Sequence, residues 1–213
     1  MKRHRTLALA LAVALPAAAQ QGDAIEVASL IYGGSKTSKC FSAEFLRALS
    51  RDSTVHCRHR FTPARLGTGD VFRFPFAIMT GEGAFSLTEA ERMNLRRYLE
   101  RGGFLLASAG CSSKAWDASF RREFAVVFPN RRLDHIPLSH PVFRTVYKVN
   151  SLATKREAAR LVGMTLGGKL VLIYSSDGLN DTGSVRGCCC CGGNELRNSR
   201  TINANILAYA LLQ

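Results

Sequence analysis

The segment from Phe74 to Phe128 reads FPFAIMTGEGAFSLTEAERMNLRRYLERGGFLLASAGCSSKAWDASFRREFAVVF. It contains, in order, an apolar run, a capped helix, a second apolar run and a second helix. This order predicts an α/β domain with a parallel sheet. It also puts a turn of small residues that carries Cys111 at the end of a buried strand, where open α/β sheets hold their ligands.

Two strands and two helices are predicted within this segment. The apolar run from Phe74 to Thr80 favours a central strand, and Phe104 to Ala107 favours the next one. Ser86-Leu87-Thr88-Glu89 has the form of a capping box, which predicts the start of a helix that Gly102-Gly103 ends. The aromatic side chains from Trp116 to Phe128 recur on one face, as expected of a second helix packed on the core.

The rest of the chain predicts further elements of the same two kinds. The alternation in 54–61 indicates a half-exposed strand near a sheet edge. With five or six strands and three or four helices, we expect one three-layer α/β sandwich with a mainly parallel sheet. The elements outside the central segment are strands at 25–32, 54–61, 161–166 and 169–174, with Gly167-Gly168 joining the last two, and helices at 41–50 and 203–212.

The N-terminus has the pattern of a secretory signal peptide. Lys2, Arg3 and Arg5 precede the apolar run from Leu7 to Leu15, and Ala17-Ala18-Ala19 offers a cleavage site. The apolar run is shorter than the ~20 residues that span a bilayer, so no transmembrane anchor is expected after cleavage. We therefore expect a signal peptide at 1–19 and a single exported domain at 20–213, in the periplasm or outside the cell.

The exported domain is strongly basic. Removal of the leader lowers the formal net charge from +13 to +10. Export and the absence of a motif that interleaves arginines with aromatic residues argue against nucleic acid as a partner. The arginines are scattered, which favours a solvated surface; attraction to anionic envelope polymers or lipid headgroups is the alternative.

Several motifs together resemble those of a known family. They are Phe76-Ala77-Ile78-Met79-Thr80-Gly81-Glu82-Gly83, Leu95-Arg96-Arg97-Tyr98-Leu99 with Gly102-Gly103-Phe104-Leu105, Ser119-Phe120-Arg121-Arg122-Glu123, Phe128-Pro129 and His140-Pro141-Val142-Phe143. Over residues 25 to 212 the chain resembles a bacterial domain-of-unknown-function family, the one numbered four-one-five-nine. That family is similar in fold to class I glutamine amidotransferases and to ThuA-like proteins. The resemblance implies a flavodoxin-like sandwich and no established activity.

The comparison with amidotransferases suggests a catalytic role for Cys111. Those enzymes place a nucleophilic cysteine on a strained strand-to-helix turn flanked by small residues. Here Ala109 and Ser113 stand where the usual glycines would be. His140 is the candidate base, although Val142 stands where a carboxylate would be expected. A buried or oxidised cysteine is the alternative for Cys111, and a locally hydrogen-bonded ring is the alternative for His140.

Four consecutive cysteines form the chemically most unusual segment. The chain has seven cysteines, so at least one stays unpaired or pairs between chains. Export favours disulfides between the run and the three other cysteines. Thiolates also suit zinc or copper(I), and redox or nucleophilic catalysis is a third reading. The run is Cys188, Cys189, Cys190 and Cys191, and the others are Cys40, Cys57 and Cys111.

Polar residues follow several of the predicted strands. Asp177 and Asp181 come after the strand 169–174, and Glu82 comes after the strand 74–80. Because ligands gather outside the strand C-termini, these carboxylates with Cys111 and Ser112 are expected to line one crevice. The alternative is that Asp177 and Asp181 only form turns.

Two classes of function follow from these features. The first is a non-catalytic exported module that binds a small molecule, a glycan, a peptide or an envelope protein. The second is a cysteine-dependent hydrolase or acyl transferase that uses Cys111. A metal-binding protein that uses the cysteine run is a further alternative.

Overall fold

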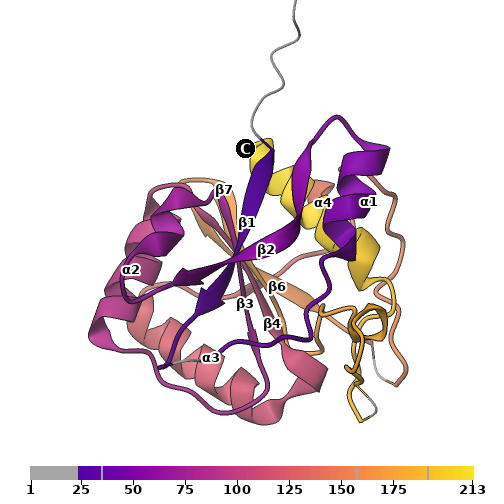
Figure 1. The fold of residues 1–213 in the computed structure, drawn as a ribbon. Helices are drawn as coiled ribbons and strands as arrows, with labels where there is room; N and C mark the ends of the chain where they lie inside the picture. Colours follow the sequence, from indigo (N-terminus) through magenta and orange to yellow (C-terminus); the bar gives the residue numbers. More distant parts are fainter. Residues whose placement is uncertain (1–23, 35, 157, 191) are drawn as a thin grey trace, which may run out of the picture.

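The computed structural model describes residues 24–34, 36–156, 158–190 and 192–213. They form a mixed α/β domain in which one sheet is covered on both faces (Figure 1). The strands are β1 (Ile25–Ile31), β2 (Cys57–Arg65), β3 (Phe76–Gly81), β4 (Phe104–Ala109), β5 (Asp134–His135), β6 (Leu161–Leu166) and β7 (Lys169–Ser175). The helices are α1 (Glu44–Asp52), α2 (Glu89–Glu100), α3 (Lys114–Val127) and α4 (Ser199–Leu211).

The seven strands lie in the order β2-β1-β3-β4-β7-β6-β5. The five strands from β2 to β7 are parallel, whereas β6 is antiparallel to β7 and to β5. The central strands β3 and β4 are buried along their whole length, as their continuous apolar sequences predict for a sheet covered on both faces. The expectation of a mainly parallel sheet is therefore confirmed.

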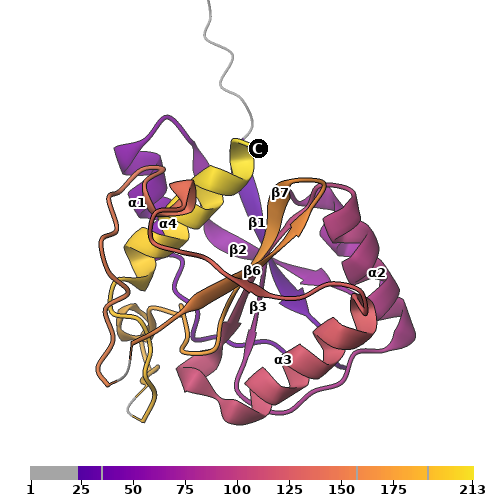
Figure 2. The ribbon, with the colours of Figure 1, turned by 180° about the vertical axis from the view of Figure 1, so that it is seen from behind.

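Two helices cover each face of the sheet, as Figures 1 and 2 show from opposite sides. Helices α2 and α3 pack on one face, where Trp116, Phe120 and Phe124 belong to the buried core. Helices α1 and α4 pack on the other, where Ile202 and Ile206 belong to a second core. No helix among the described residues is long and apolar enough to cross a membrane.

The capping box opens helix α2 two residues later than its sequence suggests. Thr88, not Ser86, is the N-cap residue. Its hydroxyl accepts from the Glu91 N–H, and the Glu91 carboxylate accepts from the Thr88 N–H. Glu91 is buried and its other carboxylate oxygen also accepts from the Gly33 N–H at 2.9 Å. Because this tertiary contact selects Glu91, the box based on Glu89 was wrong.

Both edges of the sheet carry differences from the sequence expectation. Strand β2 is an edge strand, as predicted, but it runs on to Arg65 through Pro63, a residue that a sheet tolerates at its edge. Strand β5 was missed, because two residues are too short to produce a hydrophobic period. The late hairpin joined by Gly167-Gly168 is confirmed.

Candidate functional site

The strand order makes two loops diverge at the C-terminal edge of the sheet. From β1 the chain goes to the edge strand β2, and from β3 it goes the opposite way to β4. Open α/β sheets bind ligands at such a point, outside the C-terminal ends of the strands. A cavity of about 340 Å³ lies there, and we call it the switch-point cavity. It is lined by Tyr32, Lys36, Thr37, Ser38, Lys39, Cys40, Gly81, Glu82, Gly83 and Trp116.

Two buried aromatic residues form the floor of the switch-point cavity. The Trp116 indole N–H donates to the Tyr32 hydroxyl at 2.6 Å, and that hydroxyl donates to the Thr80 carbonyl at 2.9 Å. Burial raises the pKa of Tyr32 above its usual range, so the phenol stays protonated at neutral pH. A Cβ on Gly81 would lie 2.7 Å from the Tyr32 hydroxyl. The floor therefore needs glycine at this position.

The wall of the switch-point cavity is the loop that follows β1. Glu91 holds its start through the Gly33 N–H, and Tyr32 and Lys36 exchange two backbone hydrogen bonds. A disulfide between Cys40 and Cys188 holds its end. The wall is thus fixed at both ends, while the side chains of Lys36 and Lys39 between them are exposed.

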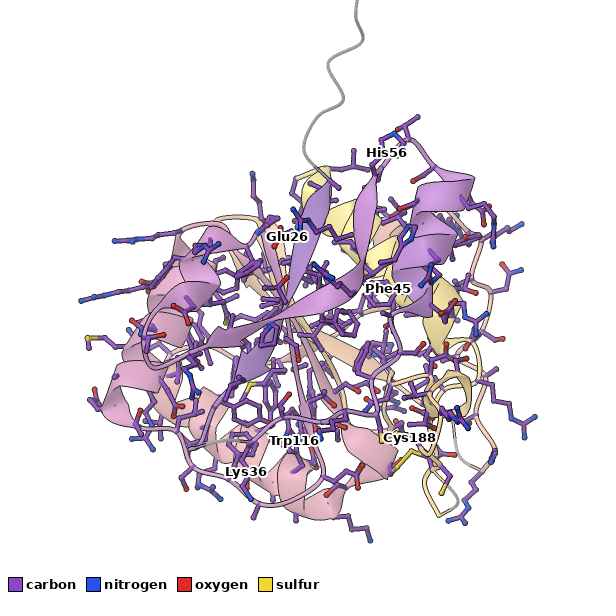
Figure 3. The ribbon with its side chains drawn as sticks, viewed as in Figure 1. Glu26, Lys36, Phe45, His56, Trp116 and Cys188 are labelled. Atoms are coloured by element: carbon purple, nitrogen blue, oxygen red, sulfur yellow. A yellow bond between two sulfur atoms is a disulfide. The ribbon has the colours of Figure 1, made fainter. Side chains whose placement is uncertain are left out.

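Three charged side chains lie around this cavity. Lys36 and Lys39 lie on the wall, and Glu82 follows β3 on the other side. None of the three forms an ion pair with a residue that the structure describes. Figure 3 shows Lys36 and Trp116 toward the end of the molecule that also carries Cys188, away from Glu26 in β1. These charges are available to a ligand.

Cys111 lies where the sequence predicted it, on the turn between β4 and α3. It and Ser112 both have left-handed backbone conformations, with φ values of 51° and 56°. Such conformations cost L-residues about 1–2 kcal/mol each. Ser113 begins α3, because its hydroxyl accepts from the Trp116 N–H. Strand-to-helix turns of this strained kind are typical of nucleophile positions.

In this structure, however, Cys111 is bonded to Cys190. A sulfur atom in a disulfide has no thiolate with which to attack a substrate. The Cys111 sulfur lies 4.0 Å from a Glu82 carboxylate oxygen and 3.4 Å from the Cys189 carbonyl oxygen. The oxidised alternative for Cys111 is the form observed.

The structure does not bring His140 to Cys111. The His140 ring accepts from the Val142 N–H at 3.2 Å and packs edge-on against Tyr209, in the last turn of α4. Cys111 instead contacts Gly193, a few residues before the first turn of that helix. The local hydrogen bond matches the alternative reading of His140. Its burial lowers the pKa of the imidazole.

Ser112 and Asp177 are brought together, but by bonds within the protein. The Ser112 hydroxyl donates to the Asp177 carbonyl and accepts from the Asn194 N–H, both at 2.7 Å. The Asn194 amide also donates to the Asp177 carboxylate at 2.9 Å. These bonds join the turns after β4 and β7 to the loop before α4.

Asp181 lies apart from Glu82, so the predicted single crevice is divided. Its carboxylate pairs with Arg200 at 3.2 Å, and it lines a second cavity of about 370 Å³ on the α4 side. That cavity also contains Glu195, which accepts from the Thr182 N–H and hydroxyl. Burial raises the pKa of Glu195, whose second carboxylate oxygen is buried and forms no hydrogen bond within the described part of the chain.

The cysteine run makes disulfides with two of the three candidate partners. Cys188 bonds to Cys40 and Cys190 bonds to Cys111, while Cys189 is free and exposed. Cys57 is free in β2, where burial raises the pKa of its thiol. Cys191 lies outside the described residues. Within those residues no group of three or more histidine, cysteine or acidic side chains is placed to hold a metal ion.

The wall of the switch-point cavity was missed by the sequence analysis. Its lysines are ordinary in composition, and Trp116 was assigned to the core. A signal was nevertheless present, since Gly33-Gly34 ends a buried strand and a polar stretch up to Cys40 follows. The strand order that places this stretch beside Gly81 and Glu82 comes only from the structure.

Residues 26–211 match the family described as Domain of unknown function (DUF4159). The chain belongs to this family. The DUF4159 match includes the last strands as well as the central segment, so the predicted family resemblance is confirmed over almost the whole fold. A comparison with curated proteins finds no match. The DUF4159 description names no activity.

Proposed function

We propose that this DUF4159 protein is an exported, non-catalytic module that binds a small ligand in the switch-point cavity. The proposal is carried by Lys36, Lys39 and Glu82 around that cavity, which form no ion pair with any residue in the described part of the chain. Binding proteins place a few convergent polar groups in a pocket of roughly 300–1,000 Å³, and this cavity falls at the lower end of that range.

The fold supports the position of the ligand. The parallel strands in the order β2-β1-β3-β4-β7 follow the flavodoxin-like arrangement, in which the ligand site lies at the β1/β3 switch point. We propose that the domain has this flavodoxin-like, amidotransferase-like class of sandwich. The cavity in question is the one between the loops after β1 and β3.

Export is proposed from two features. The pattern at 1–19 has the form of a signal peptide, and the two disulfides suit an oxidising compartment such as the periplasm. In that setting a glycan fragment, a small metabolite or an exposed segment of an envelope protein would meet the cavity.

A cavity-filling variant tests the proposal. A Cβ on Gly83 meets no atom within 4 Å, so Gly83→Trp should fill the cavity without disturbing the backbone. Gly183→Trp is the matched control, since Gly183 has equal space but lines the second cavity. We expect a thermal-shift screen of sugars, sugar acids, peptides and cell-wall fragments to find a stabilising ligand. Its effect should vanish in Gly83→Trp and remain in Gly183→Trp.

Two results of that screen would contradict the proposal. One is a screen in which no compound stabilises the wild-type protein. The other is a ligand that stabilises Gly83→Trp as strongly as wild type, because such a ligand would bind elsewhere.

A cysteine-dependent hydrolase or acyl transferase is the second candidate. The left-handed conformation of Cys111 favours it, because reduction of the Cys111–Cys190 bond would release a thiol on a strained turn just before the N-terminus of α3. Glu82, 4.0 Å away, would act as a proton acceptor, since its negative charge disfavours the thiolate. After mild reduction, iodoacetamide would then label Cys111 faster than Cys190. Equal labelling of the two cysteines would exclude this candidate.

A further inference from the structure

We propose that the ligand of the switch-point cavity is a small sugar-like acid, whose oxyanion is held by the loop after β1 and whose hydroxyl groups face Glu82. This inference rests on the proposed binding function and names the class of ligand. The oxyanion is a carboxylate or a phosphate, both of which present negatively charged acceptor oxygens to nitrogen donors.

The loop after β1 carries hydrogen-bond donors and no acidic side chain. Lys36 and Lys39 are its charged side chains, and neither ammonium group forms an ion pair with a described residue. No hydrogen bond among the described residues uses the backbone N–H of Thr37, Ser38 or Lys39. These three consecutive N–H groups, without a partner among the described residues, lie on the same loop as the two ammonium groups and could donate to an oxyanion.

The two lysines place like charges three residues apart on one loop at the cavity. The ends of this loop are held by Glu91 and by the Cys40–Cys188 bond, which keeps both residues at the cavity. One bound anion would pair with both charges, so the held loop favours an anionic ligand over a neutral one.

Glu82 limits the ligand to one anionic end. Its carboxylate lies on the β3 side of the cavity and would repel a second negative group there. A carboxylate accepts hydrogen bonds from hydroxyl groups, which are the donors a sugar presents. The mixed charge of the cavity thus matches a molecule with an oxyanion at one end and hydroxyl groups at the other.

The volume of the cavity and the net charge of the protein agree with this class of ligand. A cavity of about 340 Å³ suits a single sugar-sized molecule better than a polymer. The formal charge of +10 that remains after removal of the leader would attract anions toward the protein at low ionic strength. That attraction is unspecific, so the test must separate it from binding in the cavity.

Isothermal titration at constant ionic strength, set with sodium chloride, provides the test. The probes are glucuronate, glucose 6-phosphate, inorganic phosphate and glucose. We expect the two sugar acids to bind, phosphate to bind more weakly and glucose to give no heat. The order of the two sugar acids tells whether carboxylate or phosphate is the preferred oxyanion.

Charge-removing variants locate the anion. The double variant Lys36→Gln with Lys39→Gln should lower the affinity for the better sugar acid by about 10-fold or more, since each charged hydrogen bond contributes more than a neutral one. Lys169→Gln is the control. This exposed lysine begins β7, so it lies at the N-terminal ends of the parallel strands, away from the cavity, and the change should leave the affinity within about 2-fold. Glu82→Gln should weaken the binding of the sugar acids but not the binding of inorganic phosphate.

Each contrary result has a distinct meaning. Binding of glucose with the same affinity by wild type and by the double lysine variant would overturn the sugar-acid inference and leave the binding module intact. Equal losses in Lys169→Gln and in the double variant would show unspecific attraction and also overturn the inference. No binding by any probe, together with a blank thermal-shift screen, would remove the proposed function itself.

Discussion

Two loops at the same edge of the sheet both carry a disulfide to the segment 188–190, yet they use their polar groups in opposite ways. The loop after β1 leaves Lys36 and Lys39 without an ion pair among the residues that the structure describes. In the turn after β4, Ser112 and Ser113 hydrogen-bond to neighbouring loops or to the helix that follows. This difference fits the proposal that the first loop binds a ligand, whereas the second stabilises the fold.

The disulfides give the largest expected effects. Replacing Cys111 and Cys190 together by serine should lower the free energy of unfolding by about 2–5 kcal/mol, and replacing Cys40 and Cys188 together should do the same. Only the replacement of Cys40 and Cys188 should also weaken ligand binding, because it frees the end of the cavity wall. Urea unfolding and titration of both variants provide the measurement. Weaker binding in the Cys111/Cys190 variant alone would reverse the comparison.

Two adjacent glycines sharpen the comparison at the turn after β4. A Cβ on Gly193 would lie 2.7 Å from the Cys111 carbonyl oxygen, whereas a Cβ on Gly192 would meet nothing within 4 Å. Gly193→Ala should therefore lower the free energy of unfolding by about 1–3 kcal/mol, as overpacking does. Gly192→Ala should change it by less than about 0.5 kcal/mol. Similar values from urea unfolding of the two variants would show that the turn yields without cost.

The floor of the cavity offers a pairwise test. Tyr32→Phe removes the hydroxyl that joins Trp116 to Thr80, leaving a buried indole N–H unpaired. We expect a loss of about 1–3 kcal/mol in the free energy of unfolding. Trp116→Phe in the Tyr32→Phe background should cost less than it does alone, by about 1 kcal/mol. Additive losses in a double-mutant cycle would mean that the two rings contribute independently.

The smallest expected effect concerns pH. Burial raises the pKa of Glu195 in the folded protein, so the folded state binds this proton more tightly than the unfolded state. Its contribution is therefore present below the unfolded pKa of about 4.3 and is lost as the pH rises through the folded pKa. In urea unfolding from pH 4 upwards, the free energy of unfolding of wild type should therefore fall with pH relative to that of Glu195→Gln. Parallel curves would show that Glu195 titrates alike in both states.

Long apolar segments were predictable from sequence because burial on both faces leaves a strong pattern. Strands β3 and β4 and helix α3 all appear near their predicted positions. The start of α2 was placed two residues early, since the choice between Glu89 and Glu91 depends on Gly33, 58 residues away. Tertiary contacts of that kind leave no local signal.

The candidate site was predictable only in part. The Cys111 turn and its place at the end of β4 follow from the sequence, and Ser112 with Asp177 do meet. The wall residues Lys36 and Lys39 were missed, because only the strand order places them beside Glu82. Disulfide partners likewise depend on which loops the fold brings together.

The most direct test of ligand binding at the switch point is to map amide chemical shifts in the ¹⁵N-labelled protein during titration with the best sugar acid. We expect the perturbed amides to gather at 36–40 and 81–83, with little change at 109–113. Perturbations centred on 109–113, with 36–40 unchanged, would contradict the assignment and make the Cys111 turn the functional site.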